Sequence, residues 1–156
     1  MSLKKNQTVT SKKVYIRTFG LEMEKRDLVI VGGGPAGMAA AISAYEFGVR
    51  DILLIERDQY LGGLLNQCVH TGFGLEYFKE VLTGPEYADR FINKFMGLKG
   101  IETSLRTFVV KLTEDKTITC LMPGAMKEIR AKAVIMATGC RERTREMIHI
   151  PGTRPA

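Results

Sequence analysis

The chain has 156 residues with 45% hydrophobic and 26% charged side chains, which fits one globular domain and excludes a disordered or fibrous chain. The formal charge of +6 comes from basic residues near the two ends, and no groove-reading motif accompanies them, so we expect no nucleic acid as a partner. Three cysteines without CxxC spacing argue against a disulfide scaffold and a metal site, and favour a cytoplasmic protein. No stretch approaches the roughly 20 apolar residues that span a bilayer.

The first part of the chain predicts a βαβ unit behind a basic extension. Residues 1–26 are polar with little periodicity, and we expect them to form an N-terminal extension. Residues 27–31 are apolar and rich in β-branched side chains, which indicates a buried parallel strand. Residues 35–47 predict a helix, because Pro suits a first turn, Ala and Met favour helix, and Gly48 ends it. Residues 52–56 predict a second buried strand.

The middle of the chain predicts a second helix and a third strand. Residues 58–74 are Gly-rich, and we expect them to be irregular. A helix is expected to begin at Pro85 and to end at Gly97. Residues 101–105 predict the third strand. The helix has one apolar face, formed by side chains at 3- and 4-residue spacings: Tyr87, Ala88, Phe91, Ile92 and Phe95.

The last third predicts β-structure. Residues 107–112 and 117–122 alternate in polarity around a short polar turn, which indicates a hairpin. A turn follows at Pro123-Gly124, and residues 128–131 are at best a short strand. Residues 133–137 form another apolar run, which predicts a buried strand.

A glycine fingerprint lies between the first strand and the first helix, which is the context that gives such a motif its meaning. Gly32 makes the tight turn, Gly34 leaves room for a pyrophosphate, and Gly37 lets the helix pack closely on the strand. Pro35 and Ala36 occupy the first helical turn, where free N–H groups and the helix dipole attract phosphate. The pattern predicts a dinucleotide site that needs no basic side chain.

An acidic residue at the end of the second strand completes the pattern. Glu56 lies 24 positions after Gly32 (56 − 32), near the expected spacing of roughly 20 residues. Its carboxylate can accept hydrogen bonds from the ribose hydroxyls of adenosine and would repel a ribose phosphate. The adjacent Arg57 could pair with such a phosphate, so the preference for NAD over NADP at this site is not absolute.

Two later motifs carry a family resemblance. Gly62-Gly63-Leu64 follows the acidic residue after a short loop, and Ala137-Thr138-Gly139 ends an apolar strand far downstream. With these motifs in order, residues 27–152 resemble the FAD domain of the pyridine nucleotide-disulfide oxidoreductase superfamily, and more narrowly its flavoprotein dehydrogenase subunits. The resemblance implies an α/β fold: a Rossmann-like parallel sheet with a β-hairpin or meander crossover, in an incomplete FAD/NAD(P)-binding domain.

The resemblance also implies roles for residues. The fingerprint residues Gly32, Gly34, Ala36 and Gly37 would hold the pyrophosphate, and Glu56 the adenosine ribose. Residues 62–64 would run under the flavin side of FAD, Val109 would lie by the adenine, and Thr138 and Gly139 would bring backbone back to the cofactor. Residues 153–156 would begin a linker to a nicotinamide-binding domain, where NAD(P) is expected.

The resemblance fails at the redox-active cysteine pair of many family members, because Leu65 and His70 stand at the two thiol positions. Disulfide chemistry needs two sulfurs in reach of one another, so we expect none at this position. Cys68 and His70 could form a reactive pair, but a packed Cys and a polar His in a loop is the favoured interpretation. Cys140 is expected to be a packing residue.

The leading hypothesis is therefore the FAD-binding part of a flavin-dependent oxidoreductase that acts on NAD(P)H or a small organic substrate, with a homo-oligomer or a partner subunit as open options. The sequence identifies no catalytic residue. One alternative is an NAD-dependent dehydrogenase with a single Rossmann domain, which the hairpin disfavours because such enzymes usually insert helices there. The other is a non-catalytic module or subunit that holds a dinucleotide for a partner chain.

Overall fold

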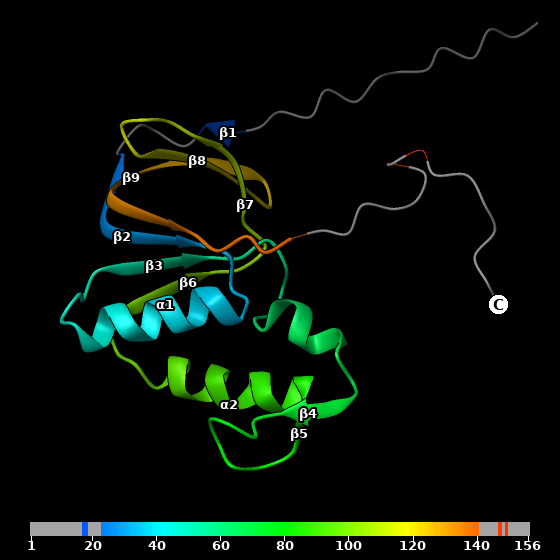
Figure 1. Cartoon of the computed structure of the whole chain (residues 1–156). Helices are drawn as coiled ribbons and strands as arrows, with labels where there is room; N and C mark the ends of the chain where they lie inside the picture. Colours follow the sequence, from blue (N-terminus) through cyan, green and yellow to red (C-terminus); the bar gives the residue numbers. More distant parts are fainter. Residues whose placement is uncertain (1–16, 19–22, 141–146, 148, 150–156) are drawn as a thin grey trace, which may run out of the picture.

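The computed structural model describes residues 17–18, 23–140, 147 and 149. Figure 1 shows two helices on one side of a sheet and a hairpin on the other. The predictions for most of the N-terminal extension, for the basic residues between 141 and 145, and for the linker at 153–156 lie outside the described residues.

Four parallel strands form the centre of the sheet. They are β2 (Glu24–Val31), β3 (Ile52–Ile55), β6 (Ile101–Ser104) and β9 (Ala125–Met136), in the spatial order β6-β3-β2-β9. The strands β2, β3 and β9 each carry a short run of apolar residues, whereas the edge strand β6 (Ile-Glu-Thr-Ser) does not. Because these strands run in one direction, the loops that follow them gather at one edge of the sheet.

An antiparallel meander extends the sheet beyond β9. The strands β7 (Phe108–Leu112) and β8 (Thr117–Met122) form the predicted hairpin, and β8 then pairs with the first half of β9 through the turn at Pro123-Gly124. Gly124 has a φ of 78°, which glycine adopts without strain. The short strand β1 (Arg17–Thr18) pairs in parallel with the start of β9.

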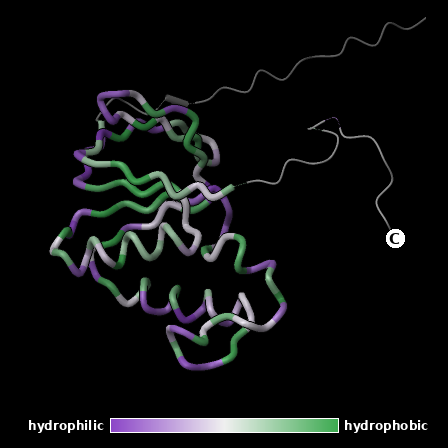
Figure 2. The backbone as a smooth tube through the Cα atoms, viewed as in Figure 1, coloured by the Kyte–Doolittle hydropathy of each residue, from purple (hydrophilic) through white to green (hydrophobic). Residues whose placement is uncertain are grey.

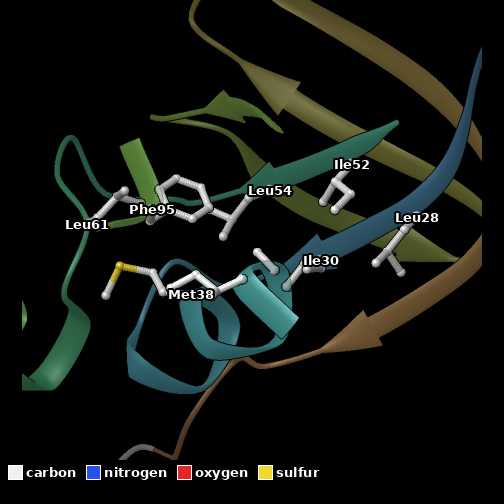
Figure 3. Close-up of a cluster of buried hydrophobic side chains, with 9 residues drawn as sticks. Leu28, Ile30, Met38, Ile52, Leu54, Leu61 and Phe95 are labelled. Carbon is white, nitrogen blue, oxygen red and sulfur yellow. The ribbon is translucent and has the colours of Figure 1, made fainter. Parts of the chain in front are cut away.

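Alternate residues of the central strands pack on opposite faces of the sheet. Leu28 and Ile30 of β2 face the helices, whereas Val29 and Val31 face the meander. Figure 2 shows the resulting hydrophobic strands, and Figure 3 shows the helix-side cluster. Its buried members are Leu28, Ile30, Met38, Ala41, Ile42, Ile52, Leu54, Leu61 and Phe95.

Two helices cover one face. Helix α1 (Pro35–Glu46) follows the fingerprint directly, and α2 (Gly84–Met96) packs beside it. Helix α2 begins with a capping box, in which Thr83 accepts from the Glu86 backbone N–H and the Glu86 carboxylate accepts from the Thr83 backbone. This reciprocal cap fixes where the helix starts.

The segment predicted to be irregular contains more structure than the sequence indicated. It holds the 3₁₀ helix η1 (Gly63–Gln67) and the strand β4 (Thr71–Phe73), which pairs with β5 (Leu82–Thr83). The chain between β4 and β5 packs on α2 through aromatic side chains. The rings of Phe78 and Phe91, for example, have centroids 5.5 Å apart.

Both helices, the first three predicted strands and the hairpin are confirmed, with three corrections. Strand β2 begins at Glu24, so residues 24–26 belong to the sheet and not to an extension. Residues 128–131 and 133–137 were predicted as separate pieces, but the first and most of the second lie in the single strand β9. The second run is also less buried than predicted: Ile135 is 37% and Met136 54% exposed.

No helix among the described residues is long and apolar enough to cross a membrane.

Replacing Phe95 with Ala should lower the free energy of unfolding by about 3–5 kcal/mol, because the ring is only 2% exposed and the neighbouring side chains cannot fill the cavity. Urea unfolding monitored by circular dichroism measures the change. Phe47→Ala is the control, since that ring is 90% exposed and its loss should change stability by less than about 0.5 kcal/mol. Equal effects of the two substitutions would contradict the described core.

A candidate dinucleotide site at the carboxyl ends of β2, β3 and β9

Three loops meet where the parallel strands end. The Gly32 N–H donates to the Ile55 carbonyl at 2.8 Å, which joins the end of β2 to the end of β3. The Ala137 N–H donates to the Val31 carbonyl at 2.8 Å, which joins β9 to β2. The fingerprint, the acidic residue and the Ala-Thr-Gly motif, separated by up to 107 positions in sequence (139 − 32), therefore lie at one place.

Two fingerprint glycines are required by the protein itself. A Cβ at Gly32 would lie 2.2 Å from the Ala137 carbonyl oxygen, and the φ of Gly32 is 113°. A Cβ at Gly37 would lie 1.8 Å from the Gly32 carbonyl oxygen. Helix α1 is thus pressed against the turn that precedes it, as the sequence predicted for these two positions.

The environment of Gly34 differs from that of Gly32 and Gly37. A Cβ there would meet only the α-carbon of Gly63, at 4.0 Å, so no described protein atom demands the glycine. Gly34 is the N-cap of α1, and no side chain caps the helix. The first turn also lacks an acidic residue. Uncapped N–H groups at a helix start, beside an open glycine, form a site for a phosphate group.

Glu56 is held in place beside this corner. Its side chain is buried, with 8% exposed. One carboxylate oxygen accepts from the Gly33 N–H at 2.6 Å, and the other accepts from the Asp58 N–H at 2.9 Å. A carboxylate has about four lone-pair positions, so two remain for ligand hydroxyls. The carboxylate is therefore fixed against the backbone of Gly33, the residue that precedes Gly34.

A second glycine pair lies across from Gly34. The Gly62 N–H donates to the Gly33 carbonyl at 2.9 Å, and a Cβ at Gly63 would lie 3.0 Å from the Gly34 α-carbon. Gly62 and Gly63 have φ values of 108° and 53°, which few residues other than glycine adopt. The two glycine-rich loops thus approach backbone to backbone.

The remaining predicted site residues surround this corner. Arg57, Thr138 and Gly139 are exposed, and Leu64 is 66% exposed at the start of η1. Val109 is half-buried in β7. The start of β7 is tied to the site, because the Thr107 N–H donates to the Glu56 carbonyl at 2.9 Å. Ala137 is half-buried against the helix-side cluster, and Pro35 and Ala36 are exposed in the first turn of α1.

The strongest charge cluster lies at the opposite end of the strands. Arg26 forms ion pairs with Glu24 and Asp51 and with the Glu102 carboxylate. Burial alone would lower the pKa of Arg26, but the hydrogen bonds that its guanidinium donates to these three carboxylates outweigh burial and raise the pKa. These charges fasten neighbouring strands together and do not face the candidate site. No group of side chains in the described part of the chain could hold a metal ion.

The cysteines do not form a redox pair. All three are free: Cys68 is half-buried, Cys120 is buried and Cys140 is exposed. The packing role expected for Cys140 is therefore wrong, because the residue follows the end of the sheet. His70 is exposed, and its Nδ1 lies 3.1 Å from the Thr71 carbonyl rather than bonding to a thiol.

Sequence analysis missed two residues that shape the site. Gly33 leaves room for two side chains, since a Cβ there would lie 2.5 Å from Leu61 Cδ2 and 3.1 Å from Glu56 Cβ and Oε2. The run of three glycines was a usable signal for this. Asn66 donates from Nδ2 to the Leu61 carbonyl at 2.8 Å, and no sequence pattern singled it out.

Gly34→Ala should weaken ligand binding, whereas Gly37→Ala should lower stability. Gly37→Ala should lower the free energy of unfolding by about 2–4 kcal/mol, since the helix must move away from Gly32. Gly34→Ala should change it by less than about 1 kcal/mol, yet raise the Kd for an adenine dinucleotide by about tenfold, because the new methyl group fills the ligand's space. Thermal unfolding with and without ligand measures both. A Gly34→Ala variant that binds normally would contradict this site.

Cys120 should resist alkylation. Burial raises the pKa of its thiol to about 11, so the thiol stays protonated, and hence unreactive, until the pH approaches that value. At pH 8, iodoacetamide followed by mass spectrometry should label exposed Cys140 while the protein stays folded, and Cys120 only after unfolding. Labelling of both at the same rate would show that the meander does not enclose Cys120.

Comparisons with known proteins agree with this geometry. Residues 26–155 match the family model "Pyridine nucleotide-disulphide oxidoreductase". Subunit HcnB of hydrogen cyanide synthase from Pseudomonas protegens is 33% identical over 123 residues, which are 74% of this chain and 25% of that protein. The chain spans about a quarter of the length of the first curated relatives it matches.

Solved structures share the fold. L-proline dehydrogenase from P. horikoshii matches with a TM-score of 0.63 and 25% identity, covering 80% of this chain and 25% of that one. Lactococcus lactis thioredoxin reductase matches with a TM-score of 0.60 and 29% identity, covering 78% and 38%. FAD is the cofactor of this family. The chain belongs to the pyridine nucleotide-disulphide oxidoreductase family of flavin-dependent oxidoreductases.

Proposed function

We propose that the site at the ends of β2, β3 and β9 binds FAD, and that the whole protein passes electrons between NAD(P)H or a small organic substrate and an acceptor. The observation that carries the proposal is the Glu56 carboxylate, fixed by two backbone N–H groups against Gly33, one residue before the open glycine Gly34. A ribose and a diphosphate, joined as in an adenine dinucleotide, need these two features next to one another.

Different residues contact different parts of the cofactor. The corner at Gly32, Gly34 and Gly37 holds the pyrophosphate with backbone N–H groups, and Glu56 holds the adenosine ribose. The family resemblance supports three further roles: residues 62–64 under the flavin side of FAD, Val109 by the adenine, and Thr138 and Gly139 beside the cofactor. Arg57 follows Glu56 and Ala137 precedes Thr138, so we include both in the cofactor site. Bound FAD supplies the redox chemistry, and the chain positions it.

We propose residues 27–152 as the FAD domain, with residues 24–26 as the start of its first central strand. NAD(P) binding belongs to a separate nicotinamide domain of the whole protein. A disulfide relay after the second glycine pair is not part of the proposal, since Leu65 and His70 occupy those positions. The three free cysteines support a reducing, cytoplasmic location. The proposal is compatible with a homo-oligomer and with a separate partner subunit.

The direct test is the cofactor of the purified protein. We expect a yellow protein that releases FAD on denaturation, and whose unfolding temperature rises with added FAD. A colourless protein stabilised by NAD and not by FAD would support the alternative, a single-domain NAD-dependent dehydrogenase. NADH oxidation with an artificial electron acceptor then separates an enzyme from a module that only holds the cofactor.

Glu56→Gln should raise the Kd for FAD by about tenfold. Both Glu56 oxygens accept backbone N–H groups, and an amide has only one oxygen, so either the Gly33 or the Asp58 N–H loses its acceptor and the ribose loses a charged one. Quenching of flavin fluorescence measures the Kd. Glu114→Gln, at an exposed position in the hairpin turn, is the matched control. The same Kd in both variants would remove Glu56 from the site.

A further inference from the structure

The turn at Gly62–Gly63 needs something to hold it. Both residues lie in the left-handed region, with φ values of 108° and 53°, and glycine also populates many other conformations. A pair of glycines therefore does not fix its own shape. A cofactor that passes beside this turn would meet a mobile loop unless neighbouring groups hold the backbone.

Asn66 holds the turn from one side. Its Nδ2 donates to the carbonyl of Leu61 at 2.8 Å, which links η1 back to the residue before the turn. The amide covers Gly62, since a Cβ there would lie 2.6 Å from Asn66 Oδ1 and 2.7 Å from Nδ2. Leu61, which accepts this bond, and Leu65, which precedes Asn66, are buried with 7% and 8% exposed, so the chain on both sides of the turn is anchored in the protein interior.

The position of the Gly62–Gly63 turn also determines how much space the candidate site has on one side of Gly34. The Gly62 N–H bonds to the Gly33 carbonyl, and a Cβ on Gly63 would lie 3.0 Å from the Gly34 α-carbon. A small displacement of the turn would therefore change the space on the side of Gly34 that faces Gly63. Glu56 lies on the side of Gly33 instead, and its carboxylate accepts from the Gly33 and Asp58 N–H groups, neither of which bonds to Asn66.

We propose that Asn66 is a positioning residue, which keeps the Gly62–Gly63 turn in the shape that admits the flavin half of FAD. This rests on the proposed function. Asn66 acts through the turn and needs no contact with the cofactor. Because Glu56 and the α1 terminus are held by other groups, loss of the Asn66 amide affects the flavin half and spares the ADP half.

The test compares two ligands in matched variants. Asn66→Ala should raise the Kd for FAD by roughly tenfold, since the Leu61 carbonyl loses its partner and the turn loosens, while the Kd for ADP changes by less than about twofold. Asn93→Ala is the control, because Asn93 donates a similar amide bond to Asp89 on the exposed face of α2, far along the chain from the turn. Fluorescence quenching gives the FAD affinity, and calorimetry gives the ADP affinity.

Two further variants guard against a folding defect. Asn66→Leu keeps the side-chain volume without the donor and should reproduce the loss for FAD. Asn66→Gln keeps an amide donor and should recover part of the affinity. The visible circular dichroism of bound flavin should differ from wild type in Asn66→Leu and not in Asn93→Ala, a change that lost stability alone would not produce.

The outcomes separate the two proposals. If the wild-type protein binds ADP and FAD equally weakly, the proposed function fails. If wild type and Asn93→Ala bind FAD well, and Asn66→Leu binds it as well as they do, then the proposal for Asn66 is overturned. It is also overturned if the Asn66 variants lose ADP and FAD to the same degree.

Discussion

The contact between Gly37 and the Gly32 carbonyl is the constraint on which the site depends. With no room for a methyl group between them, helix α1 starts directly against the end of β2. The helix terminus is then aimed at the same space as the Gly34 backbone, and a phosphate placed there meets N–H groups that no side chain occupies. The protein achieves this with backbone alone, so the position of the corner depends on packing rather than on flexible charged side chains.

Packing also explains why the acidic residue is so closely placed. Glu56 follows β3, whose residues are buried on both faces, and the absence of a side chain at Gly33 lets the carboxylate lie against the fingerprint loop. The meander covers the second face of the sheet and brings Thr107 to the Glu56 carbonyl. One connection therefore both completes the core and bonds to the backbone of Glu56.

Much of this could be predicted from the sequence, because apolar runs, glycines and prolines act locally. The strand, the glycine corner, the helix and the acidic residue each have a recognisable pattern in the sequence. The continuity of β9 has no such pattern. Its first half pairs with β8 and its second half pairs with β2, so the polarity of its side chains changes midway along the strand. The exposure of Ile135 and Met136 was missed because an apolar run shows hydrophobicity and not which neighbours cover it. Asn66 was missed because a single side chain that bonds to backbone leaves no periodic signal.

The pairing of β2 with β9 has a consequence for how the protein is made. Glu24 pairs with Ile129, so the two strands that border the corner are separated by 105 residues (129 − 24). Ordering so long an intervening stretch costs entropy before its contacts form, which slows folding. A nascent chain on the ribosome can form the βαβ unit early, but the candidate site stays incomplete until β9 has been synthesised and has joined the sheet.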